Sequence, residues 1–315
     1  MQKIQLGRSG IAVPPVIFGC NVFGWTVDKA QSFRLLDAFV DAGFNAFDTA
    51  DVYSYWVPGN HGGESETIIG EWLKSRGRRD DVLIFSKGGM EMPGKGKGLS
   101  AEYITRAIED SLKRLQTDVI DLYQSHRDDE TTPHEETLAV YEKMIKAGKI
   151  RAIGASNFSV TRFKQALEIS ASTGLPRYET MQPHYNLLER TIEADLLPLC
   201  AKEGVGVIPY YALASGFLTG KYRTEADLVK SPRGARGAGK HLDAKGLKVL
   251  AALDVVAHRY GATAAQVAIA WFKGRPGLAA PIASATTLDQ LNELVKAATV
   301  VLDGAAVAQL DAASS

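Results

Sequence analysis

Short apolar runs alternate along the chain with longer segments in which apolar residues recur every three or four positions. The short runs have the length and β-branched content of buried strands, and the longer segments have the period of amphipathic helices. Such an alternation is typical of βα units on a parallel sheet. It predicts strands at residues 16–19, 46–48, 82–87, 119–123, 150–155, 180–183, 205–210 and 279–282.

The helical segments show their period and their ends clearly. In residues 101–115, Ile104, Ala107 and Ile108 fall on one helical face, and Ser100 precedes the segment as an N-cap residue. Several segments are followed by glycine, the usual residue at the left-handed position after a helix. The predicted helices are residues 29–42, 64–75, 101–115, 135–147, 160–172, 189–203, 244–260, 264–272 and 288–298.

Eight strands with returning helices predict a (β/α)8 barrel, the TIM-barrel fold. The alternative is a doubly wound sheet, but no Gly-x-Gly-x-x-Gly fingerprint follows the strand at residues 16–19, where the chain continues Cys-Asn-Val-Phe. Residues 3–7 and 10–13 predict a β-hairpin around a Gly-Arg-Ser-Gly turn. Because no Pro/Ser-rich linker divides the chain, we expect residues 1–315 to form a single domain.

Two long irregular segments follow predicted strands. One runs from residue 53 to 63 and the other from residue 212 to 243. We expect both at the C-terminal face of the strands, where barrel enzymes keep their active sites.

Charge and cysteine content narrow the class of protein. The 315 residues include 36 Lys and Arg and 36 Asp and Glu, so the net charge is zero, which argues against nucleic acid or an anionic membrane as the main partner. The two cysteines are too few for a disulfide framework. No run approaches the ~18 apolar residues of a membrane span, and the N-terminus lacks an apolar signal core. We therefore expect a soluble, cytoplasmic protein.

Four ionisable residues stand at or just beyond strand ends: Asp48, Tyr53, Lys87 and His126. In a barrel these ends meet at one mouth. A charged lysine at the end of an apolar strand is costly unless it is paired, and Asp48 is the expected partner. Each residue alone also has a structural interpretation, as an ion pair, a loop tyrosine or a satisfied histidine. Together they favour a catalytic site.

Motifs along nearly the whole chain resemble those of the aldo-keto reductases, especially the branch that includes bacterial members and potassium-channel β subunits. In chain order they are Asp48-Thr-Ala-Asp-Val-Tyr53, Gly63-Glu-Ser-Glu, Ser86-Lys87, Asp121-Leu-Tyr-Gln-Ser-His126, Gly154-Ala-Ser-Asn-Phe158, Gln182-Pro-x-Tyr-Asn186 and Gly216-Phe-Leu-Thr-Gly-Lys221. This resemblance implies a (β/α)8 barrel that binds a nicotinamide cofactor without a Rossmann fold. It also implies that Tyr53 donates a proton to a carbonyl, that Lys87 and Asp48 tune it, and that His126 orients the substrate oxygen.

Carbonyl reduction requires a proton donor and a nearby positive charge, which Tyr53 and Lys87 could supply. Hydride delivery to a carbonyl carbon builds negative charge on the oxygen, which a nearby acid must meet. A free tyrosine has a pKa of ~10, and an ammonium ~4 Å away favours the phenolate by up to ~3 pKa units. A Schiff-base role for Lys87 is opposed by its carboxylate neighbour. A metal site at Asp48 and His126 lacks further His or Cys ligands, so we expect no metal.

The resemblance also implies cofactor contacts. Ser156, Asn157 and Gln182 match residues that hydrogen-bond the nicotinamide carboxamide, and Tyr210 matches the aromatic residue that stacks on the ring. Taken alone, Ser156-Asn157 is also typical of a helix N-cap. The other positions matched beside the cofactor are Gly19, Cys20, Asn21, Asp48, Leu213, Gly216, Leu218 and Lys221. Of these, Lys221 is the counter-charge to the pyrophosphate, and Cys20 is expected to pack rather than to act as a nucleophile.

The segment 284–293 matches the adenosine-binding part of the channel-subunit branch. There Thr286, Gln290 and Arg236 are expected to hold a 2′-phosphate and Glu293 the adenine. Other branches have Lys and Arg where this chain has Ser284 and Gln290, so Arg236 is the one formal cation for that phosphate. NADPH is the expected cofactor, with NADH as the alternative.

Aromatic residues near the mouth suggest a substrate pocket. Phe23, Trp25, Tyr55 and Trp56 are expected to line it, although loop packing explains them equally well. The sequence thus predicts NADPH-dependent reduction of an aldehyde or ketone, or the reverse reaction, on a small-molecule carbonyl substrate. The alternative is a cofactor-binding, redox-sensing regulatory protein of the same fold. The oligomeric state and the identity of the substrate stay open.

Overall fold

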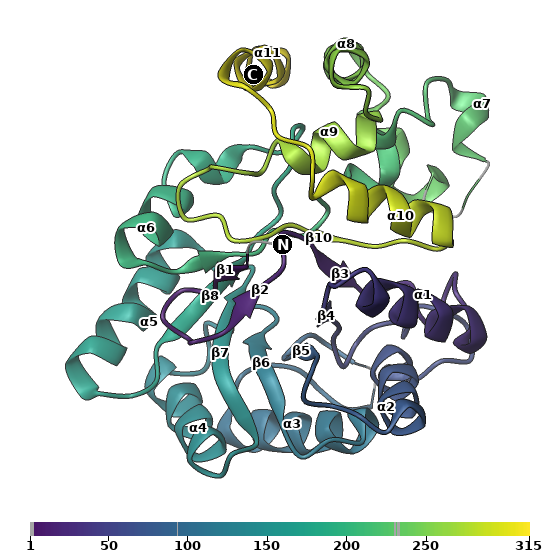
Figure 1. Ribbon diagram of the computed structural model, residues 1–315. Helices are drawn as coiled ribbons and strands as arrows, with labels where there is room; N and C mark the ends of the chain where they lie inside the picture. Colours follow the sequence, from purple (N-terminus) through teal and green to yellow (C-terminus); the bar gives the residue numbers. More distant parts are fainter. Residues whose placement is uncertain (1–2, 93, 230, 232–233) are drawn as a thin grey trace.

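The computed structural model describes residues 3–92, 94–229, 231 and 234–315, with only the backbone of Ala235 and Arg236. Within these residues, eight parallel strands form one sheet in the order β10-β3-β4-β5-β6-β7-β8-β9 (Figure 1). The strands are β3 (Ile17–Gly19), β4 (Ala46–Asp48), β5 (Leu83–Gly88), β6 (Ile120–Ser125), β7 (Ile150–Ser156), β8 (Tyr178–Gln182), β9 (Gly206–Val207) and β10 (Ile282–Ala283).

Hydrogen bonds close this sheet on itself. β10 pairs with β3 on one side, with Ile282 opposite Ile17. On the other side, the Val207 amide donates to the Gly277 carbonyl and the Ala279 amide donates to the Val207 carbonyl, each at 2.8 Å. The chain before β10 is thus joined to β9, and the predicted (β/α)8 barrel is confirmed.

An N-terminal hairpin of β1 (Ile4–Gln5) and β2 (Ala12–Val13) lies over the centre of the barrel (Figure 1). Leu6 and Val13 of this hairpin region are fully buried in an apolar cluster with Phe85 and Leu122 of the barrel interior. Burying these side chains closes the end where the strands begin. The opposite end, where the strands finish, is left for the site.

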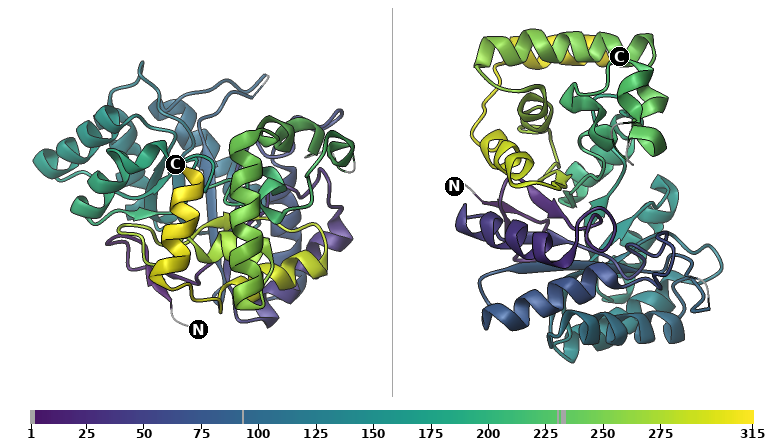
Figure 2. Two further views of the ribbon diagram at one scale, coloured as in Figure 1. Left: turned by 90° about the horizontal axis from the view of Figure 1, so that it is seen from above. Right: turned by 90° about the vertical axis from the view of Figure 1, so that its right-hand side faces the viewer.

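Helices return the chain between strands and cover the outside of the barrel (Figures 1 and 2). α3 buries Ile104, Ala107 and Ile108 as its period predicts, and the Ser100 hydroxyl accepts a hydrogen bond from the Tyr103 amide at 3.4 Å. The α-helices are α1 (Lys29–Asp41), α2 (Glu64–Arg76), α3 (Ala101–Leu115), α4 (His134–Lys146), α5 (Val160–Thr173), α6 (Leu196–Glu203), α7 (Glu225–Leu228), α8 (Ala244–Tyr260), α9 (Ala264–Ala270), α10 (Leu288–Ala297) and α11 (Gly304–Ser314).

The helix predicted for residues 189–203 is shorter in the structure, because α6 begins only at Leu196. Asn186 and Glu189 pair instead through two backbone hydrogen bonds of 3.0 and 3.1 Å. This turn and the short helix η1 (Thr191–Glu193) use the residues that the apolar period assigned to the helix. The turn at Asn186–Glu189 therefore replaces the first part of the helix that the apolar pattern predicted.

The sequence also did not predict α11. Its sequence, rich in alanine, has little contrast between apolar and polar faces, so the helical period is weak. α11 lies beside α8, as both views of Figure 2 show, and Lys248 Nζ donates to the Ala312 carbonyl at 3.1 Å. Packing against α8, rather than its own pattern, holds this helix.

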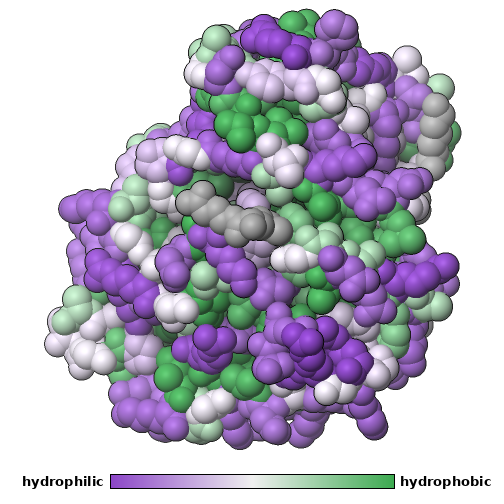
Figure 3. All heavy atoms as spheres, in the orientation of Figure 1, coloured by the Kyte–Doolittle hydropathy of each residue, from purple (hydrophilic) through white to green (hydrophobic). Residues whose placement is uncertain are grey.

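The long segment after β9 is folded into short helical turns. They are η2 (Ala214–Thr219), α7, η3 (Gly234–Ala238) and η4 (Gly239–His241). On the face shown in Figure 3, hydrophilic side chains predominate and apolar side chains form smaller groups between them. Among the described residues, no helix is both long and apolar enough to cross a membrane.

Candidate active site

The C-terminal ends of the strands surround a cavity of about 720 Å³. Asp48 is the last residue of β4, Lys87 lies near the end of β5, and His126 directly follows β6. Tyr53 lies in the turn after β4, where its amide donates to the Ala50 carbonyl at 3.2 Å. The structure therefore brings the four predicted catalytic side chains together, since parallel strands end at one rim.

Lys87 is fully buried, and its ammonium group has three oxygen partners. Lys87 Nζ donates to Asp48 Oδ1 at 2.6 Å, to the Thr49 carbonyl at 2.7 Å and to the Tyr53 hydroxyl at 3.1 Å. Three donors and three acceptors satisfy the ammonium group in one geometry. Lys87 thus links the Asp48 carboxylate to the Tyr53 phenol.

The other oxygen of Asp48 is held by two amide groups. Gln182 Nε2 donates to Asp48 Oδ2 at 3.0 Å, and Gln124 Nε2 donates to the same atom at 3.2 Å. The two glutamines are also joined, because Gln182 Nε2 lies 3.0 Å from Gln124 Oε1. Hydrogen bonds to both oxygens therefore fix the orientation of the Asp48 carboxylate, and Oδ1 is the atom that faces the Lys87 ammonium.

Burial and the lysine act in opposite directions on the Tyr53 phenol. Burial raises the pKa of Tyr53, the Lys87 ammonium lowers it, and the net pKa is about 12. The effect of Lys87 has the expected sign, but burial outweighs it, so Tyr53 carries its proton at neutral pH. Burial also works against the charge of Lys87, yet Asp48 and Tyr53 outweigh it, and the pKa of Lys87 is raised.

His126 faces Tyr53, with ring centroids 6.0 Å apart. Burial lowers the pKa of His126 well below its usual range, and the charges of Lys87 and Arg127 lower it further. The imidazole is therefore neutral at pH 7. Its buried Nδ1 atom has no hydrogen-bond partner among the described residues. A neutral ring can donate one hydrogen bond to an oxygen placed between it and Tyr53.

Asn157, which directly follows β7, is hydrogen-bonded to a second group of polar residues. Its backbone is left-handed, with φ of 56°. Its Nδ2 donates to the His126 carbonyl and to Ser156 Oγ, each at 3.0 Å, and its Oδ1 accepts from the Tyr210 hydroxyl at 2.8 Å. The His184 ring stacks on the Tyr210 ring, with ring centroids 5.4 Å apart and planes inclined by 14°. The hydrogen bond to Asn157 and the stacking with His184 thus fix the orientation of the Tyr210 ring, which lines the cavity.

The far part of the cavity is lined by residues from η2 and α10. Gly216 has a left-handed backbone, with φ of 90°, and Lys221 lies beside it. Glu293 Oε2 accepts from the Thr263 hydroxyl at 2.6 Å, and Gln290 Oε1 accepts from the Thr286 hydroxyl at 3.0 Å. This end offers a cation and several polar groups to a long ligand.

The sequence model of the aldo/keto reductase family matches residues 15–315. The chain belongs to the aldo/keto reductase family. It is therefore an oxidoreductase of a family that uses NAD(P)H for carbonyl chemistry.

Similar proteins come from bacteria, plants and fungi. An uncharacterized oxidoreductase of Bacillus subtilis (strain 168), YrpG, is 35% identical over 311 residues, which cover 96% of this chain and 93% of YrpG. A probable voltage-gated potassium channel subunit beta of Oryza sativa subsp. japonica is 35% identical over 312 residues, covering 96% and 92%. Versiconal hemiacetal acetate reductase of Aspergillus parasiticus is 30% identical over 330 residues, covering 96% and 94%.

Most residues predicted to bind the cofactor line the cavity of this aldo/keto reductase. They are Gly19, Asn21, Asp48, Ser156, Asn157, Gln182, Tyr210, Leu213, Gly216, Lys221, Gln290 and Glu293. Cys20, Leu218 and Thr286 do not line it, and burial raises the pKa of the Cys20 thiol. The side chain of Arg236 lies outside the described residues.

The structure places two of the four residues predicted for the substrate pocket at the cavity and two elsewhere. Trp25 and Trp56 line the cavity, with ring centroids 5.7 Å apart, but Phe23 and Tyr55 do not. Phe23 is fully buried and stacks on Phe18 in the apolar core. Tyr55 is one of the large apolar side chains exposed to solvent.

Sequence reasoning missed several residues of the site. Gln124 holds Asp48, and Met90, Arg127 and Tyr211 line the cavity. Arg127 could have been found from its place directly after His126 at the end of a strand. Gln124 had no such signal, because its contact with Asp48 spans 76 positions of the sequence.

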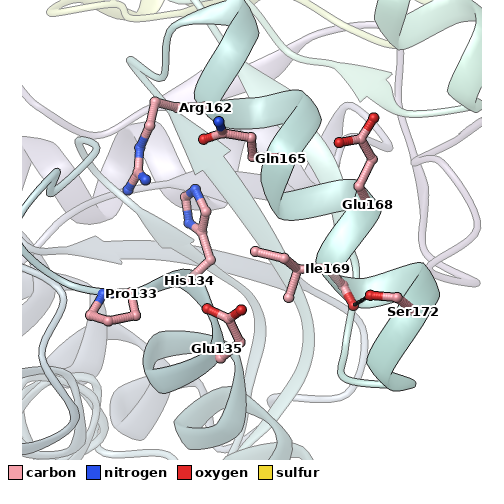
Figure 4. Close-up of a pocket in the computed structure, with 8 residues that line it drawn as sticks. All are labelled: Pro133, His134, Glu135, Arg162, Gln165, Glu168, Ile169 and Ser172. Atoms are coloured by element: carbon pink, nitrogen blue, oxygen red, sulfur yellow. Dashed lines mark hydrogen bonds between the residues drawn. The ribbon is translucent and has the colours of Figure 1, made fainter.

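A second hollow of about 410 Å³ lies outside the barrel, at the start of α4 and along α5 (Figure 4). His134, Glu135, Arg162 and Glu168 are among its lining residues, and none of the residues lining it lines the cavity at the strand ends. Arg162 is already paired, because its Nε donates to Asp128 Oδ2 at 2.9 Å. Over the described part of the chain, no three His, Cys, Asp or Glu side chains form a group that could hold a metal ion.

Proposed function

We propose that this aldo/keto reductase catalyses NADPH-dependent reduction of an aldehyde or ketone, or the reverse oxidation, with Tyr53 as the proton donor. The observation that carries the proposal is the buried chain of contacts from Asp48 through Lys87 to the Tyr53 hydroxyl. It ends at a phenol that is protonated at neutral pH and that lines the cavity. A proton donor with a neighbouring cation is what the reduction of a carbonyl oxygen needs.

The cavity lining suits a nicotinamide dinucleotide. It offers a flat aromatic ring at Tyr210, polar groups at Ser156 and Asn157, and the ammonium of Lys221. Gly19 also lines the cavity, and a side chain there would collide with Ser284, because a Cβ atom would lie 2.8 Å from Ser284 Oγ. When bound, the reduced cofactor supplies the hydride.

The residues of this chain have separate tasks in the proposed reaction. Tyr53 donates its proton to the carbonyl oxygen as negative charge develops there. Lys87 stabilises the phenolate that remains, because its charge lies 3.1 Å from the phenolic oxygen. Asp48 keeps Lys87 charged, and neutral His126 donates a hydrogen bond that orients the same oxygen.

We further propose that NADPH is preferred over NADH. Support comes from the resemblance that assigns Arg236, Thr286 and Gln290 to a 2′-phosphate, with Glu293 beside the adenine. The Thr286–Gln290 hydrogen bonds and the position of Gln290 in the cavity lining agree with a polar subsite at this end. An arginine contact would distinguish the phosphorylated cofactor by a charge-assisted hydrogen bond.

A redox-sensing, regulatory protein with little turnover is the second candidate. It is favoured by the 35% identity to a protein named as a potassium channel beta subunit. The set of Asp48, Tyr53, Lys87 and His126 is compatible with both functions, so measured turnover decides between them.

A panel of aldehydes and ketones separates the two functions. With NADPH present, the fall in nicotinamide absorbance is followed for each compound, and cofactor affinity is measured in parallel. Turnover of at least one class of carbonyl that is lost in Tyr53→Phe supports the enzyme. Tight NADPH binding without turnover of any compound would favour the regulatory protein.

A further inference from the structure

Arg127 is a charged group of the cavity that the proposed reaction leaves unused. It directly follows His126, lines the same cavity and is exposed to solvent. Its guanidinium group makes no hydrogen bond or ion pair with any residue that the structure describes. An unpaired guanidinium inside a cavity is available to a ligand.

The acidic residues next to Arg127 are engaged elsewhere. Asp128 binds the Arg162 guanidinium at 2.9 and 3.1 Å. Asp129 accepts from the hydroxyls of Thr131 and Thr132, each at 2.6 Å, and from the Leu99 amide at 2.9 Å. The carboxylates of Asp128 and Asp129 are therefore bound to partners other than Arg127.

The charge of Arg127 acts at the reacting end of the cavity. After burial and Lys87, it contributes to the lowered pKa of His126, and it also lowers the pKa of Tyr210 against the effect of burial. The other charges among the described lining residues are accounted for differently. Asp48 is paired with Lys87, and Lys221 lies beside Gly216 in the part assigned to the cofactor. Glu293 lies in that part as well and accepts hydrogen bonds from Thr263 and Gln266. The catalytic end thus has a positive charge without a counterion.

The cavity wall beside Tyr53 is aromatic. Trp25 and Trp56 meet edge to face at 5.7 Å, and Trp56 lies 6.2 Å from the Tyr53 ring. Met90 and Tyr211 also line the cavity. A molecule that fits here has an apolar or aromatic body between its polar ends.

We propose that Arg127 selects carbonyl substrates that carry a carboxylate, so that Tyr53 and His126 bind the carbonyl oxygen while the guanidinium binds the carboxylate. The proposal rests on the proposed carbonyl reduction and names its substrate class. A guanidinium matches a carboxylate with two parallel hydrogen bonds. A single positive charge balances a carboxylate, whereas a phosphate dianion would keep an unmatched charge.

The test compares 4-carboxybenzaldehyde with its methyl ester, which has the same ring and aldehyde but no charge. For each enzyme, kcat/KM is measured for both compounds with NADPH, and the acid-to-ester ratio is calculated. The electronic difference between the two compounds cancels when ratios are compared between variants. Arg127→Gln removes the charge, Arg127→Lys keeps it without the planar fork, and Arg34→Gln removes an exposed arginine from α1 as the matched control.

We expect the ratio to fall by about 10- to 100-fold in Arg127→Gln and by less in Arg127→Lys. Arg34→Gln is expected to keep the wild-type ratio within about twofold. Equal losses for acid and ester in Arg127→Gln would overturn the proposal, because Arg127 would then support the site rather than bind the substrate. An unchanged ratio would overturn it as well.

Binding distinguishes a failure of this proposal from a failure of the proposed function. In the presence of NADP⁺, both compounds and 4-formylphenyl phosphate are titrated by the fluorescence of Trp25 and Trp56. If neither aldehyde is reduced but the acid binds more tightly than the ester only when Arg127 is present, carbonyl reduction is wrong and the carboxylate site stands. Tighter binding of the phosphate than of the acid, or no preference for the acid, would overturn the carboxylate assignment.

Discussion

Lys87 Nζ lies 3.1 Å from the Tyr53 hydroxyl and 4.8 Å from the centre of the Tyr53 ring. A buried ammonium at this distance lowers the cost of forming a phenolate, yet the burial of the same phenol raises its pKa to about 12. The tyrosine is therefore kept as an acid in the resting protein, and Lys87 acts when the proton leaves.

Tyr53→Phe removes the phenolic hydroxyl and keeps the ring. Because the Tyr53 hydroxyl is the proposed proton donor, kcat for carbonyl reduction is expected to fall by at least ~10²-fold. NADPH affinity is expected to change little, since the residues assigned to the cofactor lie elsewhere in the cavity. Steady-state rates and a fluorescence titration check both statements. A variant that keeps half of the wild-type turnover would contradict the role of Tyr53.

Lys87→Met removes the charge and keeps much of the stem volume. The phenolate loses its stabilising neighbour, so activity is expected to fall by at least ~10²-fold, with a smaller loss for Asp48→Asn. The double variant is expected to lose little more than Lys87→Met alone, because the two residues act as a unit. Rates of all three variants are compared with thermal unfolding curves, which separate misfolding from lost chemistry. Losses that add in log rate would argue against the coupling.

Asp51 supplies a prediction on pH and stability. Its carboxyl is buried, and neither oxygen has a partner among the described residues. Burial, followed by the charge of Glu66, raises the pKa of Asp51 to about 8, so the group is neutral at pH 7. In the unfolded chain, the Asp51 carboxyl has its ordinary, lower pKa and therefore loses its proton at a lower pH than in the folded protein. Folding stability from this group is therefore complete at low pH and is lost as the pH rises toward 8.

Asp51→Asn removes this titration. Between pH 5 and pH 7, the wild-type free energy of unfolding is expected to fall by about 2 to 3 kcal/mol more than that of Asp51→Asn. Urea unfolding at several pH values measures the difference, and other titrating groups cancel because both proteins contain them. Asp118→Asn, at an exposed carboxylate, is the matched control and is expected to follow the wild type. Parallel curves for wild type and Asp51→Asn would contradict a neutral buried carboxyl.

Arg236→Ala tests the cofactor preference. A charge-assisted hydrogen bond to phosphate is worth ~1.5–3 kcal/mol, so NADPH binding is expected to weaken by about 10- to 150-fold. NADH lacks the phosphate, and its affinity is expected to stay nearly constant. Tryptophan fluorescence titrations of both cofactors measure this. Equal losses would place Arg236 at the shared part of the cofactor, and no loss for either would favour use of both cofactors through Thr286 and Gln290.

The sequence by itself determined the barrel and the four residues at its mouth. Short apolar runs and amphipathic segments are local patterns, and they report which side of each element is buried. Residues such as Asp48, Lys87 and His126 stand at strand ends, and parallel strands in a barrel end at one rim. Their proximity therefore follows from topology before any side-chain position is known. The hydrogen bond between Lys87 and Asp48 is the pairing that the cost of burying a lone lysine requires.

Only the tertiary structure decided the contacts that depend on assembled distances. Gln124 reaches Asp48 across 76 positions, Phe23 turns into the core rather than the cavity, and α11 forms by packing on α8. None of these has a local period or a spacing that reveals it. The same holds for the net pKa of Tyr53, since its direction depends on burial outweighing the charge of Lys87. Local sequence encodes which face of an element is apolar, whereas partners, burial and electric fields exist only once the elements have packed together.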